Sequence, residues 1–216
     1  MNTTTQRPRP WDAQLARRLI EPLVHTRVTP NHLTTVRLLV GVAAVWAFMH
    51  AGYLWGNLGA LLFVLSNFLD HTDGELARLS GKTSRIGHIY DLASDALIHV
   101  ILFAGIGYGL RGGELGPWAV ALGVIAGSAV SFIFWMRMVI EERLGKAGTQ
   151  LNSIAGFETE DVLYLMPLVT LTDMLQPFLL AASVGAPLYA LWTVGEYIRS
   201  GRPQPVEVRA LRQRQR

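Results

Sequence analysis

Residues 70–95 read DHTDGELARLSGKTSRIGHIYDLASD, a segment that holds four aspartates at fixed intervals within an apolar chain. They are Asp70, Asp73, Asp91 and Asp95. No Asp, Glu, Lys or Arg occurs from Leu38 to Leu69, and the residues after Asp95 are again apolar up to Arg111. Ionisable groups in a membrane-length apolar setting are expensive to keep and indicate function. Clustered acids repel one another unless a cation lies between them, so the segment predicts a metal site.

The spacing of the acids predicts how they meet. Asp70 and Asp73 are three residues apart and Asp91 and Asp95 are four apart, so each pair shares one face of a helix. Antiparallel packing of the two helices would gather all four beside the loop between them. Oxygen ligands, with no Cys in the chain, favour Mg²⁺, Mn²⁺ or Ca²⁺ over zinc. Two such ions about 4 Å apart can clamp a phosphoryl group. A simpler alternative is that the side chains of Arg78 and Arg85 neutralise the second aspartate pair, on the later helix, with no metal ion.

The composition is typical of a membrane protein. Of the 216 residues, 50% are hydrophobic and only 16% are charged, and the mean hydropathy is +0.30. A soluble domain averages about 25% charged residues. A membrane span needs about 20 mostly apolar residues. Six segments come into question, 31–53, 57–78, 86–110, 117–140, 158–172 and 174–197, and the fifth of them is short and opens with acids. We therefore expect an all-α bundle of six transmembrane helices.

Basic residues predict the orientation of this bundle. They gather before the first span, in alternate connections and after the last span, which places both termini in the cytoplasm. These flanking charges suit anionic lipid headgroups, whereas a nucleic-acid protein would need a contiguous basic face. Trp11, Leu15 and Leu19 recur every four residues and predict a helix lying on the cytoplasmic leaflet. We therefore expect an N-terminal segment (1–30), a six-helix transmembrane domain (31–200) and a basic tail (201–216).

Two small residues, Gly123 and Gly127, stand four apart in the fourth predicted span. Such pairs allow helix backbones to approach closely. They indicate either a seam between two copies of the chain or close packing inside one bundle.

The pattern Asp70-x2-Asp73-Gly74-x2-Ala77-Arg78-x8-Gly87-x3-Asp91-x3-Asp95 resembles the signature of the CDP-alcohol phosphotransferase (CDP-alcohol phosphatidyltransferase) family at every fixed position. The six-span layout extends the similarity to most of the chain. The resemblance implies a membrane enzyme of phospholipid biosynthesis, a homodimer, in which an alcohol hydroxyl attacks a CDP-linked substrate and releases CMP. The small size of the chain favours the bacterial inner membrane.

The resemblance also implies roles for individual residues. Asp70, Asp73 and Asp91 would hold Mg²⁺ or Mn²⁺, with two ions expected. Asp95 would be the general base and an additional metal ligand. The residues implied for the nucleotide pocket are Gly74, Arg78, Ser84, Gly87 and Asn31.

The acceptor alcohol is less constrained by the sequence. Ala96 follows Asp95, where family members with phosphorylated acceptors commonly carry Lys or Arg, and this weakens such an acceptor. Arg85 and Arg137 remain candidates to bind an acceptor phosphate. The resemblance favours transfer of a phosphatidyl group from CDP-diacylglycerol to a small polar alcohol. The alternative is a choline or ethanolamine phosphotransferase that uses CDP-choline or CDP-ethanolamine with diacylglycerol.

A membrane metal-ion transporter is the alternative from a different class. Its acids should lie near the bilayer centre, often on broken helices in repeated halves. Here the acids lie near the cytoplasmic ends of the predicted spans, and no repeat is visible in the sequence. The enzyme is therefore the favoured prediction.

Overall fold

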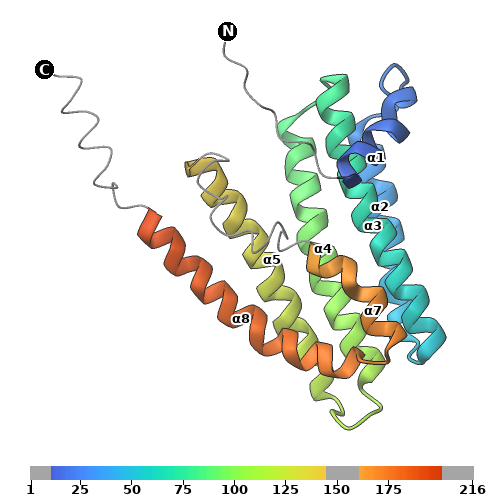
Figure 1. Ribbon diagram of the computed structural model, residues 1–216, viewed down its shortest axis with the longest axis vertical. Coiled ribbons are helices and arrows are strands. Elements are labelled where there is room, and N and C mark those ends of the chain that lie inside the picture. Colours follow the sequence, from blue (N-terminus) through green and yellow to red (C-terminus); the bar gives the residue numbers. More distant parts are fainter. Residues whose placement is uncertain (1–10, 145–160, 201–216) are drawn as a thin grey trace, which may run out of the picture.

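The computed structural model describes residues 11–144 and 161–200, and within these ranges all regular structure is helical. Residues 1–10 and the predicted tail at 201–216 lie outside the described residues. The α-helices are α1 Trp11–Ile20, α2 Pro30–Met49, α3 Tyr53–Ser80, α4 Arg85–Leu110, α5 Trp118–Leu144, α7 Met166–Leu171 and α8 Leu175–Ser200. The 3₁₀ turns are η1 Glu21–Leu23 and η3 Asp161–Leu165. Helices α2 to α5 run alternately in opposite directions, and α8 lies beside α5 (Figure 1). The predicted all-α class is confirmed.

Four helices, α2, α4, α5 and α8, are long and apolar enough to cross a membrane. The predicted membrane character is therefore confirmed, but the predicted count of six spans is not. The fifth span was predicted at 158–172, of which 158–160 lie outside the described residues. The described part forms η3 and the six-residue α7, which are shorter than the about 20 residues that a helical span requires. The second predicted span lies in α3, which is not among the four.

A helix forms where the N-terminal amphipathic segment is predicted. α1 buries Ala16 and Ile20, and it packs along α3. Leu15 and Leu19 lie on its exposed face, at 43% and 56% exposure. An exposed row of leucines suits a helix that rests on a lipid surface.

The acid-bearing segment is a hairpin of α3 and α4. α3 ends at Gly81, whose φ of 66° is a left-handed conformation that glycine adopts without strain. α4 begins after Ser84, whose Oγ accepts a hydrogen bond from the Gly87 amide at 2.9 Å. In the loop between them, Lys82 Nζ donates to the carbonyl oxygen of Thr26 at 2.7 Å. The loop is thereby tied to the segment that precedes α2, next to the acids.

Packing is tightest between α4 and α5. A Cβ added to Gly123 would lie 2.2 Å from the carbonyl oxygen of Phe103, and one added to Gly127 would lie 2.7 Å from that of His99. Real Cβ atoms do not approach backbone so closely, so both glycines are needed for this contact. The interpretation of this pair as close packing within one bundle is confirmed. The core beside it consists of Ala44, Phe48, Phe63, Leu102, Phe103 and Ile106.

Candidate active site

The carboxylates of α3 and α4 converge near the loop of the hairpin. Asp70, Asp73 and Asp91 each offer an oxygen within 4.8 Å of the oxygens offered by the other two. Asp73 is buried, and Asp70 and Asp91 are partly buried. Asp95 lies one turn beyond Asp91 on α4 and is not part of this close trio. We call these four residues the acid cluster.

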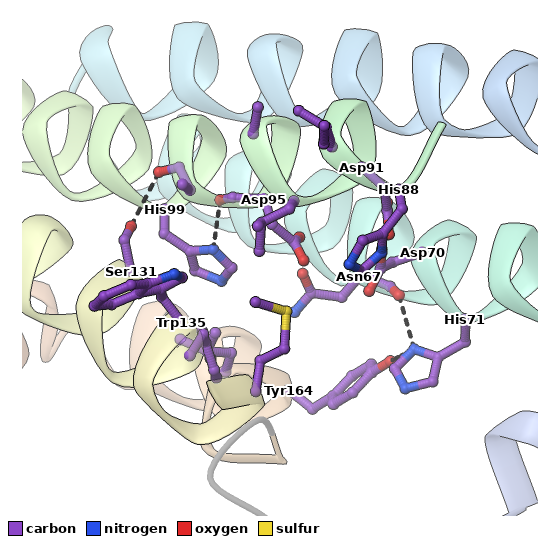
Figure 2. Close-up of a pocket in the computed structure, with 17 residues that line it drawn as sticks. Asn67, Asp70, His71, His88, Asp91, Asp95, His99, Ser131, Trp135 and Tyr164 are labelled. Atoms are coloured by element: carbon purple, nitrogen blue, oxygen red, sulfur yellow. Dashed lines mark hydrogen bonds between the residues drawn. The ribbon is translucent and has the colours of Figure 1, made fainter. Parts of the chain in front are cut away.

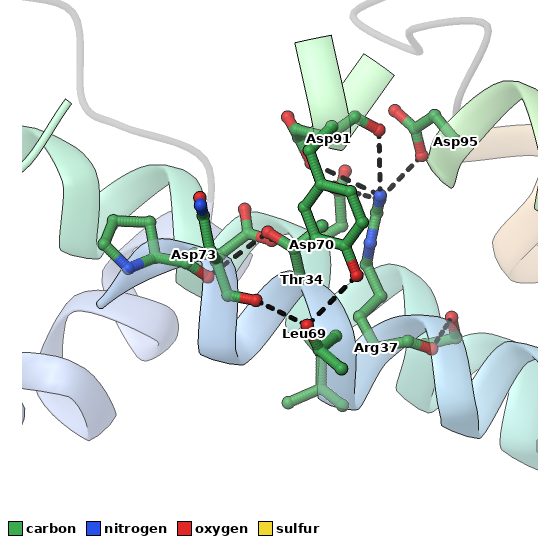
Figure 3. A network of polar contacts seen from close by, with 12 residues as sticks. Thr34, Arg37, Leu69, Asp70, Asp73, Asp91 and Asp95 are labelled. Atoms are coloured by element: carbon green, nitrogen blue, oxygen red, sulfur yellow. Dashed lines mark hydrogen bonds and ion pairs between the residues drawn. The ribbon is translucent and has the colours of Figure 1, made fainter. Parts of the chain in front are cut away.

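The guanidinium of Arg37, from α2, lies among these acids (Figure 3). Its Nη1 donates to a carboxylate oxygen of Asp70 and, at 2.6 Å, to one of Asp95. Its Nη2 donates to the carboxylate of Asp91 at 3.3 Å. Asp73 instead accepts a hydrogen bond from Thr34 Oγ1 at 2.8 Å. Three carboxylates therefore contact a single guanidinium, and when all four acids are ionised the acid cluster carries an excess of negative charge.

The other two arginines of the hairpin do not neutralise the acids of α4. Arg78 forms an ion pair at 3.0 Å with Glu75 on its own helix, and its side chain is 65% exposed. Arg85 is exposed and forms no ion pair with the acid cluster within the described residues. The plainer interpretation from the sequence is therefore wrong in its choice of partner, because the counter-charge comes from Arg37 on a third helix.

The donor set of the acid cluster fits a hard divalent cation. The trio offers only carboxylate oxygens, which Mg²⁺ and Mn²⁺ prefer, and the chain contains no Cys. A cation at this position would share Asp70 and Asp91 with Arg37 and would offset the excess negative charge. The residues present are therefore compatible with the predicted metal.

The residues predicted for the nucleotide form two groups beside the acids. Asn31, Ser84 and Gly87 meet where α2 and α4 begin: a Cβ on Gly87 would lie 2.7 Å from Asn31 Oδ1 and 3.0 Å from Ser84 Oγ. Gly74 follows Asp73 on α3, and a Cβ there would approach only Arg78 Nη2, at 3.9 Å. Gly87 is needed for local packing, whereas Gly74 leaves open space beside the acid cluster.

A cavity of about 460 Å³ adjoins the acid cluster between α3, α4, α5 and η3. Asp70, Asp91 and Asp95 line it, and Asp95 and Asn67 point toward one another (Figure 2). The other polar or aromatic residues that line it include His71, His88, His99, Ser131, Trp135 and Tyr164. Neither Arg85 nor Arg137 is among the lining residues, and the described part of the lining contains no Lys or Arg at all.

The sequence profile of the CDP-alcohol phosphatidyltransferase family matches residues 27–191, which include α2 to α7 and most of α8. This chain belongs to that family. The prediction of an enzyme family from the aspartate pattern is thereby confirmed, and the matched range contains every residue of the acid cluster together with Arg37.

Curated relatives of this chain carry several different names. The chain is 33% identical over 121 residues to archaetidylinositol phosphate synthase from Pyrococcus horikoshii, which covers 56% of this chain and 60% of that protein. It is 38% identical over 69 residues to CDP-diacylglycerol–glycerol-3-phosphate 3-phosphatidyltransferase from Rickettsia felis, covering 32% of this chain and 38% of the relative. It is 28% identical over 185 residues to cardiolipin synthase (CMP-forming) from Streptomyces coelicolor, covering 84% and 83%. The matched segments thus span less than two thirds of the length of the first two relatives.

From the sequence, Thr34 is missed as a partner of the acids, whereas Arg37 is expected to pair with a lipid phosphate or with a carboxylate of the acid cluster. Thr34 gave no signal, since a threonine in an apolar span is unremarkable without knowledge of what it faces. Arg37 did give one, because an arginine inside an apolar span requires a partner. Its three carboxylate contacts became visible only once α2 was placed against α3 and α4.

Proposed function

We propose that this chain is a membrane enzyme that transfers a phosphatidyl group from CDP-diacylglycerol to the hydroxyl of a small polar alcohol and releases CMP. The observation that carries this proposal is the convergence of Asp70, Asp73 and Asp91 beside a cavity that Asp95 lines. Membership of the family supports a CDP-linked substrate. The name of the Rickettsia relative specifies CDP-diacylglycerol, and we extend this donor to the present chain.

In the proposed site, Asp70, Asp73 and Asp91 hold one or two Mg²⁺ or Mn²⁺ ions, with Asp95 as an additional ligand. Such ions, when bound, neutralise charge on the diphosphate and on the departing CMP. Asn31, Ser84 and Gly87 border the nucleotide on one side, and Gly74 leaves room for it on the other. The exposed guanidinium of Arg78 is available to bind a phosphate oxygen.

Asp95 is proposed to act as the general base. It lines the cavity, so its carboxylate is accessible to a hydroxyl that enters there. It takes the proton as the hydroxyl oxygen bonds to phosphorus and the bond from phosphorus to the CMP oxygen breaks. Arg37 holds one Asp95 oxygen at 2.6 Å and thereby orients the carboxylate.

The lining of the cavity supports an acceptor without a phosphate group. A phosphorylated alcohol would need a cationic side chain, and the described lining offers imidazoles, an amide, aromatic rings and carboxylates instead. Arg85 lies outside that lining, as does Arg137, so we no longer assign an acceptor phosphate to either. An uncharged polyol or an amino alcohol is the acceptor class that these groups suit.

We further propose the membrane arrangement that the sequence predicts: six spans, both termini in the cytoplasm, α1 on the lipid surface, and a homodimer in a bacterial inner membrane. The course of the chain supports the even number of spans, because η3 and α7 run back toward the end of the bundle where α8 begins (Figure 1). We also propose the division into residues 1–30, 31–200 and 201–216.

The test is CMP release by the purified full chain with Mg²⁺ or Mn²⁺ and CDP-diacylglycerol, across a panel of alcohols. The panel contains glycerol, inositol, serine and ethanolamine, the phosphorylated forms of glycerol and inositol, and phosphatidylglycerol. Release with an unphosphorylated alcohol supports the proposal. If CMP is released only from the mixture of CDP-choline and diacylglycerol, the phosphotransferase alternative is favoured. Metal transport into vesicles with no CMP release from any mixture would replace the enzyme with a transporter.

A further inference from the structure

A second arginine lies within an apolar span. Arg137 belongs to α5, in the stretch Trp118–Ile140 that is apolar enough to cross a membrane. It forms no ion pair with a carboxylate within the described residues. Its Nη2 donates to Tyr189 Oη on α8, and its Nε is buried without a hydrogen-bond partner in the described structure. A guanidinium in such a setting requires an anion, and the described part of the chain supplies none.

An apolar groove lies beside this arginine. It has a volume of about 310 Å³ and runs between α5 and α8, which lie side by side in Figure 1. Its walls include Phe103, Ile133, Phe134, Phe178, Gly185 and Tyr189. No charged side chain is among its described lining residues. Tyr189 belongs both to the groove and to the contact with Arg137, so the cation marks one boundary of an otherwise apolar surface.

We propose that this groove binds an anionic phospholipid of the bilayer, with one acyl chain between α5 and α8 and its phosphate on Arg137. A guanidinium offers parallel N–H donors that match two phosphate oxygens, and the buried Nε would thereby gain the partner that it lacks. An acyl chain matches the apolar walls. The groove adjoins the acidic cavity, since Phe134 and Leu163 line both, but neither Arg137 nor Tyr189 lines the cavity, so the lipid phosphate would lie outside it.

A second copy of the chain fits this surface less well. In a two-fold symmetric contact whose axis passes through this surface, each groove would meet another groove and each Arg137 would lie near another Arg137. Such a contact would bring two uncompensated cations together and supply no anion. A phospholipid provides both the missing charge and the apolar chain.

The first experiment measures the charge requirement. The purified full chain in detergent is titrated separately with phosphatidylglycerol, diacylglycerol and inorganic phosphate, and bound ligand is counted by native mass spectrometry. We expect Arg137→Gln to weaken phosphatidylglycerol binding about 10-fold, the scale of losing one charge-assisted hydrogen-bonded contact. Arg137→Lys should restore part of the affinity. Arg111→Gln is the control, since Arg111 stacks on Tyr108 with its guanidinium carbon 3.5 Å from the ring centroid, yet is exposed and lines no part of the groove.

The second experiment measures the apolar requirement with two glycines of α8. A Cβ on Gly185 or on Gly195 would meet no atom within 4 Å, so a leucine fits at either position. Only Gly185 lines the groove. We expect Gly185→Leu to reduce phosphatidylglycerol binding by about 10-fold and Gly195→Leu to leave it unchanged.

Three results would overturn the proposal. The first is phosphatidylglycerol binding that neither Arg137→Gln nor Gly185→Leu changes. The second is equal loss of inorganic phosphate and phosphatidylglycerol binding in Arg137→Gln with no effect of Gly185→Leu, which would indicate a phosphate site without a lipid chain. The third is a change of oligomeric state in Gly185→Leu, seen by light scattering, with lipid binding intact, which would make the groove a contact between copies.

Discussion

The α2–α4 region and the α5–α8 region each contain an arginine within an apolar helix, but the two arginines are compensated in opposite ways. Arg37 meets three carboxylates from α3 and α4, and the surrounding acids outnumber it. Arg137 donates a hydrogen bond to the hydroxyl of Tyr189, which lines an apolar groove, and it contacts no acid in the described structure. The α2–α4 region therefore has uncompensated negative charge that a cation can neutralise. The α5–α8 region has an uncompensated positive charge that an anion can neutralise. Local charge balance, more than composition, distinguishes a metal site from a lipid site here.

The largest effect is expected in the acid cluster. Asp95→Asn keeps the size of the side chain but removes the proposed base, so CMP release should fall about 10²- to 10⁴-fold. Thermal stability should change little by comparison, as one hydrogen bond from Arg37 can still be accepted by the amide oxygen. Asp173→Asn, at the residue between α7 and α8, is the control and should retain full activity. Near-normal activity of Asp95→Asn would refute the assignment of the base.

The two arginines themselves provide the sharpest comparison. Without divalent cation, Arg37→Gln should lose about 3 kcal/mol of stability, because the acids of α3 and α4 are left without their counter-charge. Mg²⁺ should then restore the melting temperature by more than it raises that of the unmodified chain. Arg137→Gln should show a smaller loss that does not respond to Mg²⁺. Identical responses of the two variants would remove the distinction between the two regions.

The two regions also differ in how closely their helices pack: α5 lies tightly against α4 at Gly123, whereas Gly185 of α8 faces open space. Gly123→Ala inserts a Cβ about 2 Å from a backbone oxygen of α4 and should destabilise the bundle by about 1–3 kcal/mol. Gly185→Ala faces open space and should be neutral or stabilising by up to about 1 kcal/mol, since alanine favours a helix over glycine. Thermal unfolding in one detergent measures both. A stability loss in Gly185→Ala as large as that in Gly123→Ala would mean that α5 and α8 are packed as tightly as α4 and α5.

The smallest effect is expected at the proposed nucleotide pocket. Gly87→Ala forces Asn31 or Ser84 to shift, because the new methyl would lie 2.7 Å and 3.0 Å from their side-chain oxygens. We expect the KM for CDP-diacylglycerol to rise about 10-fold, or about 1.4 kcal/mol, with a smaller change in kcat. A change confined to kcat would place these residues away from the nucleotide.

The acid cluster was predictable from the sequence for a simple physical reason. The spacing within each aspartate pair fixes a helix face, and the short loop between the helices forces them to pack antiparallel. Contacts from the third helix, α2, were only partly predictable: the sequence indicated an anionic partner for Arg37 but not which carboxylates, and it gave no indication of the contact of Thr34. The fifth predicted span is not confirmed, because the described residues 161–171 fold as η3 and the short α7, with Pro167 at the start of α7. Hydropathy measures whether a segment tolerates lipid and says little about whether it stays in one straight helix.

The surplus of carboxylates over guanidinium in the acid cluster implies an order of arrival for the reactants. A diphosphate ester is an anion, and a site with net negative charge repels it. In the proposed reaction, divalent ions would therefore load before the CDP-lipid or together with it, and we expect kinetic analysis to show ordered rather than random addition. Before the ions bind, the protein would be inactive, with its acids only partly neutralised by Arg37, and its activity would depend on the supply of free divalent ions at the membrane surface.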